Sequence, residues 1–173
     1  MIHKTTRSIL SVLLAALLLV TSTPLTPAFA DGGAVSLQSE SGKGRALEGD
    51  GTEDDPYKIA TAADLLEFAD KVNNKNQTSA WAELTADIDL SSVCSKEKGN
   101  WTPIGNSSNE YTGTFNGQNF KISGLYINSD DNDQGLFGRV NGGTVKNLTV
   151  SGSVSGNNHV GGVVGVNSGS VIN

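Results

Sequence analysis

Carboxylates are the side chains in this sequence that could hold a metal ion. Asp130, Asp131 and Asp133 lie within one short polar segment. Calcium takes about six to eight oxygen ligands, and such a segment is rich in oxygen atoms. The segment does not match an EF-hand loop, because Asn141 stands twelfth from Asp130, where a glutamate belongs. The three aspartates are therefore candidate calcium ligands, and a solvated loop is the alternative interpretation.

Aromatic rings are the second group of side chains with a chemical use. A ring of this kind can stack on a sugar or fill a hydrophobic core, and the sequence alone leaves both roles open. The candidate carbohydrate-binding residues are Trp81, Trp101, Tyr111 and Tyr126.

The sequence contains no set of residues with the types and spacing of a known catalytic site. His159 and Cys94 are the one histidine and the one cysteine beyond residue 30. A zinc site needs three or four nitrogen or sulfur ligands, and a nucleophile needs an oriented base. We therefore predict no catalytic residue, no cofactor and no metal centre, and classify the protein as a non-enzyme. Cys94 has no partner for a disulfide, so we expect a small buried side chain.

Net charge restricts the possible partners. The chain has 12 Lys and Arg against 18 Asp and Glu, a formal charge of −6. Nucleic acids and anionic membranes bind clustered cations, so neither is an expected partner. The sequence contains 21 glycines and 6% aromatic residues, which favours a repetitive β architecture over a helical bundle.

Residues 1–30 have the pattern of a secretory signal peptide. Lys4 and Arg7 precede an apolar stretch at positions 9–20, and Ala28 to Ala30 form an A-x-A cleavage site. The apolar stretch is shorter than the ~20 residues of a membrane-spanning helix. We predict a secreted or bacterial cell-surface protein whose mature chain is not inserted in a membrane. Residues 31–49 are rich in glycine and serine and predict a flexible linker.

The segment 61–72 predicts an amphipathic helix. Thr61 and Asp64 have the spacing of a capping box. A helix before a stacked repeat can cover the apolar end of the first unit. Its apolar face is expected to contain Leu65, Leu66, Phe68, Ala69 and Val72.

Residues 111–173 repeat themselves. The segment 135–138 recurs 27 positions later at 162–165, and 143–147 recurs after 26 at 169–173. Phe115 and Phe137 are 22 apart, and the apolar positions 122, 125 and 127 match 145, 148 and 150 after 23. Such periods predict a parallel β-helix, or β-solenoid, with a capping α-helix. Strands are expected at 81–90, 113–115, 120–127, 135–140, 143–154, 160–166 and 170–172.

The sequence Gly-Leu-Phe-Gly at 135–138, followed by Gly-Thr-Val-Lys-Asn-Leu-Thr-Val at 143–150, resembles the GLUG motif of bacterial secreted and surface proteins. Upstream segments, including WTPIG at 101–105, are similar to the region that precedes GLUG repeats. The resemblance implies a right-handed β-helix at the cell surface. GLUG repeats also occur in IgA-cleaving metallopeptidases, but this sequence has no His-Glu-x-x-His zinc motif.

These observations predict an exported, non-catalytic β-helix at residues 50–173, with a cap at 50–105 and GLUG-type repeats at 111–173. It would serve as a surface stalk, scaffold or adhesin-type binding domain, with host or cell-wall glycans or surface proteins as partners. An open strand edge after the last repeat predicts self-association through the C-terminal coil. The alternatives are a carbohydrate-binding or polysaccharide-degrading β-helix, and an N-terminal fragment of a larger surface protein or protease.

Overall fold

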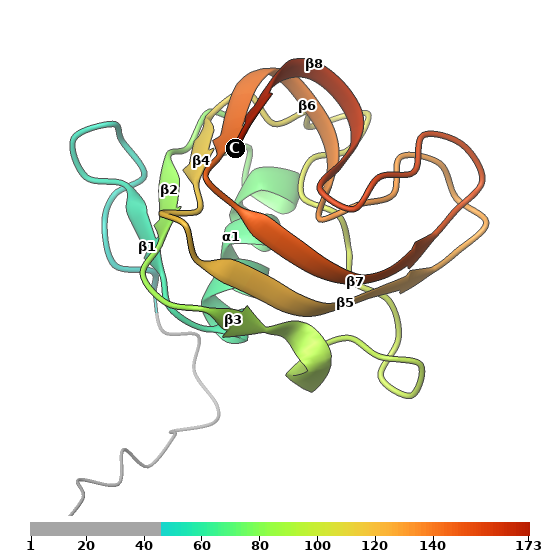
Figure 1. The fold of residues 1–173 in the computed structure, drawn as a ribbon. Coiled ribbons are helices and arrows are strands. Elements are labelled where there is room, and N and C mark those ends of the chain that lie inside the picture. Colours follow the sequence, from blue (N-terminus) through green and yellow to red (C-terminus); the bar gives the residue numbers. More distant parts are fainter. Residues whose placement is uncertain (1–45) are drawn as a thin grey trace, which may run out of the picture. The chain divides into compact units, whose positions relative to one another are not determined.

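The computed structural model describes residues 46–173, so the predicted signal peptide and most of the predicted linker lie outside the described residues. The described residues are predominantly β, as predicted, with one α-helix and one 3-10 turn (Figure 1). The elements in chain order are β1 (Tyr57–Ile59), α1 (Ala62–Asn74), β2 (Ala82–Leu84), β3 (Ile88–Asp89), η1 (Leu90–Ser92), β4 (Thr114–Asn116), β5 (Lys121–Asn128), β6 (Phe137–Lys146), β7 (Thr149–Ser155) and β8 (Val164–Ile172).

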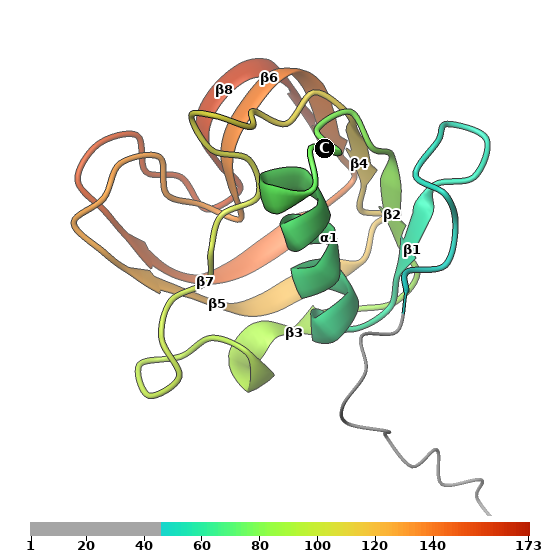
Figure 2. The same cartoon turned by 180° about the vertical axis from the view of Figure 1, so that it is seen from behind.

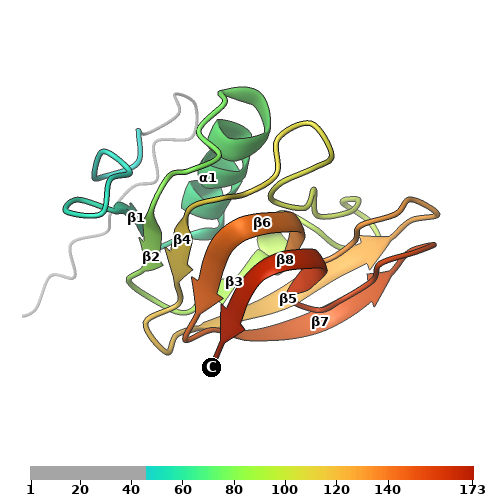
Figure 3. The same cartoon turned by 90° about the horizontal axis from the view of Figure 1, so that it is seen from above.

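The strands form two parallel sheets. One sheet has the order β1-β2-β4-β6-β8 and the other has the order β3-β5-β7. From β2 onward, consecutive strands alternate between the two sheets, and from β4 onward each strand pairs with the strand that lies two strands earlier in the chain. Figure 3 shows β6 beside β8 and β5 beside β7. Each sheet therefore grows in chain order.

The strand register confirms the longer predicted spacings and corrects the shorter ones. Phe137 pairs with Val164 after 27 residues. Val145, however, pairs with Phe115, and Ile122 pairs with Val150. The spacings of 22 and 23 residues are therefore wrong. Phe115 and Phe137 lie in the same sheet but are not register partners, and Ile122 and Val145 lie in different sheets. Apolar alternation has the same period of two in both sheets, so it does not distinguish them.

Several strand predictions differ from the structure. The predicted gap between 160–166 and 170–172 is absent, because β8 is continuous. The segment 81–90, predicted as one strand, contains β2 and β3, which belong to different sheets. The predicted break at residues 141–142 is instead a register shift within the continuous strand β6. The chain turns at Asn147, whose φ of 53° lies in the left-handed region, and β7 follows.

The helix α1 has the predicted capping box: the Thr61 hydroxyl accepts from the Asp64 N–H, and the Asp64 carboxylate accepts from the Thr61 N–H. Seen from behind, α1 lies in front of the two sheets (Figure 2). Four of the five predicted face residues are buried, whereas Leu66 is 42% exposed and does not belong to the buried face. Within residues 46–173, no helix has the length and hydropathy needed to cross a membrane.

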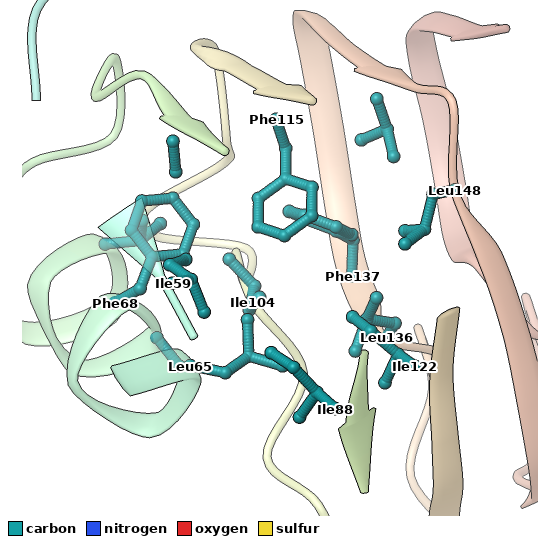
Figure 4. Close-up of a cluster of buried hydrophobic side chains, with 14 of the residues drawn as sticks. Ile59, Leu65, Phe68, Ile88, Ile104, Phe115, Ile122, Leu136, Phe137 and Leu148 are labelled. Carbon is teal, nitrogen blue, oxygen red and sulfur yellow. The ribbon is translucent and has the colours of Figure 1, made fainter. Parts of the chain in front are cut away.

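Aromatic and aliphatic side chains from α1 and both sheets fill the core (Figure 4). Phe68 of α1 contacts Tyr57, Tyr111 and Phe115, with ring centroids 5.8 to 6.4 Å apart. Cys94 is buried, as predicted. Leu47 is buried as well, and Glu48 pairs with Lys58. The packed domain therefore starts before residue 50, within the segment predicted to be linker.

Candidate functional site

The outer face of the five-stranded sheet carries the candidate site. Ala82 and Leu84 of β2 are buried, so Trp81 and Glu83 point to the opposite face. Parallel pairing places Glu83 beside Lys58 of β1 and Asn116 of β4. Because Asn116 in turn pairs with Lys146 of β6, these strands present one row of polar side chains.

A cavity of about 350 Å³ and another of about 160 Å³ both border Glu83. The larger one also borders Lys58 and Asp64. Lys58 already pairs with Glu83, and the Asp64 carboxylate already accepts from the Thr61 N–H at the start of the helix. The smaller one contains the half-buried ring of Trp81. We call it the Trp81 groove, and its lining residues are Glu53, Pro56, Trp81, Ala82, Glu83, Thr114, Asn116 and Lys146.

Hydrogen bonds hold two polar side chains of the Trp81 groove, those of Glu83 and Asn116. Lys58 Nζ and Gln118 Nε2 donate to the two carboxylate oxygens of Glu83. The hydrogen bonds from Lys58 and then from Gln118 lower the pKa of Glu83, so this carboxylate is ionised at neutral pH. Asn116 Oδ1 accepts from the Gln118 N–H and from Asn147 Nδ2, both at 3.1 Å. Within the described chain, Lys146 makes no ion pair.

The structure separates the four predicted carbohydrate-binding aromatics. Trp101 is 2% exposed and donates from Nε1 to the Leu136 carbonyl at 3.0 Å. Tyr111 is fully buried, and its hydroxyl donates to the Ala80 carbonyl at 2.8 Å. Neither ring has a face open to a sugar, so these two residues are corrected to core residues. Burial also raises the pKa of Tyr111 well above its ordinary value. Tyr126 is half-buried on β5 of the other sheet.

The candidate calcium ligands do not converge. Asp130 and Asp131 are exposed, and the Asp131 carboxylate accepts from the Ser129 hydroxyl at 2.8 Å. Asp133 instead faces Arg139 and His159. Among residues 46–173, no group of three or more His, Cys, Asp or Glu side chains is placed to hold a metal ion.

Asp133 is the centre of an ionic cluster that the sequence interpretation missed. Its carboxylate accepts from Arg139 Nε at 2.8 Å and faces His159 Nδ1 at 2.8 Å, while Arg139 Nη1 donates to Glu110 at 3.2 Å. Burial raises the pKa of Asp133, but hydrogen bonds from Arg139 and His159 outweigh burial and leave the pKa below its ordinary value. The signal was present in the sequence, because His159 follows Asp133 by 26 residues, the spacing of the strand register.

Comparison with known proteins finds two long relatives. The chain is 39% identical over 106 residues to a Gly-rich membrane protein of Evansella cellulosilytica, covering 60% of this chain. It is 38% identical over 135 residues to halomucin of Haloquadratum walsbyi, covering 72% of this chain. The matched regions span only 12% and 1% of those relatives' lengths. No family model and no solved structure matches the chain, so the GLUG resemblance stays a prediction.

Proposed function

We propose that residues 46–173 form a right-handed parallel β-helix that serves as a non-catalytic scaffold module of an exported surface protein. The observation that carries this proposal is the parallel register of the two sheets, in which successive strands alternate and each strand from β4 onward pairs with the one two strands earlier. A chain that stacks in this way extends by adding units at one end. Such a module supplies length and rigidity rather than a reaction.

The strands β7 and β8 are the edges at which such an array would continue. Each is the last strand of its sheet. Val171 pairs with Val145, which is 1% exposed, but Val171 itself is 46% exposed. An unpaired strand next to an uncovered apolar position accepts another strand. The partner is a further unit of the same kind, supplied by the same chain or by a second copy.

The surface location is supported by two independent features. The sequence begins with the predicted signal peptide. The names of the two relatives are Gly-rich membrane protein and halomucin, and both proteins are many times longer than the matched region. We infer that this module belongs to the outside of the cell, where long proteins built from repeated units serve as stalks or coats.

A measurement of self-association tests the scaffold proposal directly. Light scattering of the purified chain is expected to show a mass that rises with concentration. Val171→Lys should suppress this rise, because a charge on the open end opposes stacking. Leu66→Lys is the matched control, since Leu66 on α1 is 42% exposed and distant in sequence from β8. A strict monomer with strong amide protection of residues 160–172 would overturn stacking by a second copy and the open edge on which the proposal rests.

The non-catalytic part of the proposal has its own test. The purified chain is incubated with pectin and with other polysaccharides, and released reducing ends and unsaturated ends are measured. No release above the rate of heat-denatured protein is expected. Release by the folded chain would establish a polysaccharide-degrading enzyme instead.

A further inference from the structure

We propose that the Trp81 groove binds one pyranose ring of a neutral glycan. This inference is independent of the scaffold proposal, because the groove lies over β2, β4, β6 and the segment before β1 rather than at the open edges of β7 and β8. It assigns a ligand class to a cavity whose residues come from four separate segments. The argument rests on a stacking surface, a set of polar partners and the balance of charge.

Trp81 supplies the stacking surface. The Trp81 backbone N–H donates to the Gly51 carbonyl at 2.8 Å, and the Trp81 backbone carbonyl accepts from the Tyr57 N–H at 2.9 Å. The backbone is therefore held on both sides, and the half-buried ring borders the cavity together with Pro56 and Thr114. An aromatic side chain on a backbone that is held in place offers apolar contact area at a small entropic cost. The apolar C–H face of a pyranose fits such a ring.

The polar lining suits hydroxyl groups. A hydroxyl both donates and accepts hydrogen bonds, so a sugar needs both kinds of partner in one cavity. The lining contains two groups of acceptors, the carboxylates of Glu53 and Glu83, and one cationic donor, the Lys146 ammonium. The Glu83 oxygens already accept from Lys58 and Gln118, which leaves one further lone pair on each. Asn116 Oδ1 is occupied by two internal hydrogen bonds, so its Nδ2 is the atom of this side chain that we propose as the donor to a ligand.

Charge balance favours a neutral ligand. Lys58 neutralises Glu83 through their ion pair. Glu53 and Lys146 contribute opposite charges to the same lining, so the groove has no excess of either sign. A uronate or a sulfated sugar would face Glu53 without a second cation in the lining. The volume of about 160 Å³ is below the ~300–1,000 Å³ of pockets for drug-sized ligands, so one ring is accommodated and the rest of the glycan lies outside.

The experiment is a titration of the purified chain with cellotetraose and with maltotetraose, followed by tryptophan fluorescence and calorimetry. Trp101 is 2% exposed, so a ligand-induced change in emission or in quenching by acrylamide reports Trp81. We expect saturable binding of at least one neutral oligosaccharide. Trp81→Ala should weaken binding at least about tenfold, as loss of a central aromatic anchor does. Trp81→Phe keeps a ring and should retain part of the affinity.

Lysine variants provide the matched control. Lys146→Met should weaken binding severalfold, whereas Lys121→Met on the other sheet should leave it unchanged. Circular dichroism checks that each variant folds. If Trp81→Ala does not fold, two other measurements decide the question. They are the affinities of Trp81→Phe and Lys146→Met, and the protection of wild-type fluorescence from acrylamide quenching by the ligand.

Three outcomes would overturn the assignment. The first is the absence of a saturable signal with either neutral tetrasaccharide. The second is an affinity of the Trp81 and Lys146 variants that equals the wild-type affinity. The third is tighter binding of trigalacturonate than of the neutral probes. The last outcome would show an anionic ligand class. None of them bears on self-association, so the failure of this inference is distinguishable from the failure of the scaffold proposal.

Discussion

His159 Nδ1 lies 2.8 Å from the Asp133 carboxylate, although the two residues are 26 positions apart. The same spacing separates Thr144 from Ser170, which pair in the sheet. The contact therefore joins corresponding places of consecutive units, between a loop before β6 and a loop before β8. Arg139 adds a second contact to the same carboxylate. Backbone hydrogen bonds also join the two loops, from the Asp133 N–H to the Asn158 carbonyl at 2.9 Å and from the Gln134 N–H to the His159 carbonyl at 3.0 Å. The ionic cluster adds side-chain contacts to this backbone pairing.

Replacing Asp133 with Asn should lower stability in a manner that depends on pH. The folded-state pKa of Asp133 lies below its ordinary value of 3.8, so the ionised side chain stabilises the fold. This contribution is complete above 3.8 and disappears as pH falls through the lower folded-state value. Urea unfolding at about pH 7 should show a loss of about 1 kcal/mol for Asp133→Asn. The difference from wild type should shrink as pH falls below 3.8.

Asp130→Asn is the matched control, because Asp130 is exposed in the same loop. Asp130→Asn should change the free energy of unfolding by less than about 0.5 kcal/mol both at neutral pH and at the acidic pH of the same experiment. Equal losses for Asp130→Asn and Asp133→Asn at neutral pH would show that loop charge, rather than the contacts of Asp133, causes the effect.

The sequence was sufficient for features with a local signature. The Thr61 and Asp64 capping box and the 27-residue spacing of Phe137 and Val164 are both present in the structure. Assignment of strands to sheets was not accessible, because Ile122 and Val145 occur in the same alternating pattern but belong to different sheets. Only the pairing register, which depends on loop lengths between strands, resolves this ambiguity.

The candidate site was predictable only in part. Trp81 was among the candidates, and the structure places it at a cavity. Trp101 and Tyr111 are similar residue types, but each finds a backbone carbonyl as a hydrogen-bond acceptor inside the core. Composition and spacing contain no information about such long-range acceptors. Lys146 joins the groove only through the pairing of β4 with β6.

Phe68→Ala should destabilise the domain strongly, and Leu66→Ala should not. Phe68 is fully buried and contacts three aromatic rings, whereas Leu66 on the same helix is 42% exposed. Truncation of a buried phenylalanine costs about 3–5 kcal/mol. The exposed control should change stability by less than about 0.5 kcal/mol. Chemical denaturation measures both, and similar losses for the two variants would contradict the packing of α1 described here.

Gly105→Ala should cost more than Gly142→Ala, although both glycines have positive φ, 78° and 73°. A Cβ at Gly105 would lie 2.4 Å from the Arg139 carbonyl oxygen, whereas a Cβ at Gly142 meets nothing within 4 Å. Both variants pay about 1–2 kcal/mol for the left-handed backbone. The steric conflict at Gly105 should add about 1–3 kcal/mol. Equal unfolding midpoints would show that the backbone near Arg139 moves away at little cost.

Asn147 combines a backbone role and a side-chain role, and two substitutions separate them. Its φ of 53° suits the turn between β6 and β7, and its Nδ2 donates to Asn116 Oδ1 at 3.1 Å. Asn147→Gly keeps the backbone conformation but loses the hydrogen bond, at a cost of about 0.5–1.5 kcal/mol. Asn147→Ala loses the bond and strains the turn, which adds about 1 kcal/mol.

Thermal and urea unfolding should therefore rank wild type above Asn147→Gly, and Asn147→Gly above Asn147→Ala. Asn157→Ala is the control, because Asn157 is exposed and has no positive φ. It should leave stability within about 0.5 kcal/mol of wild type. An alanine variant as stable as the glycine variant would mean that the turn relaxes out of the left-handed region. In that case the hydrogen bond to Asn116, rather than the backbone conformation, accounts for asparagine at this turn.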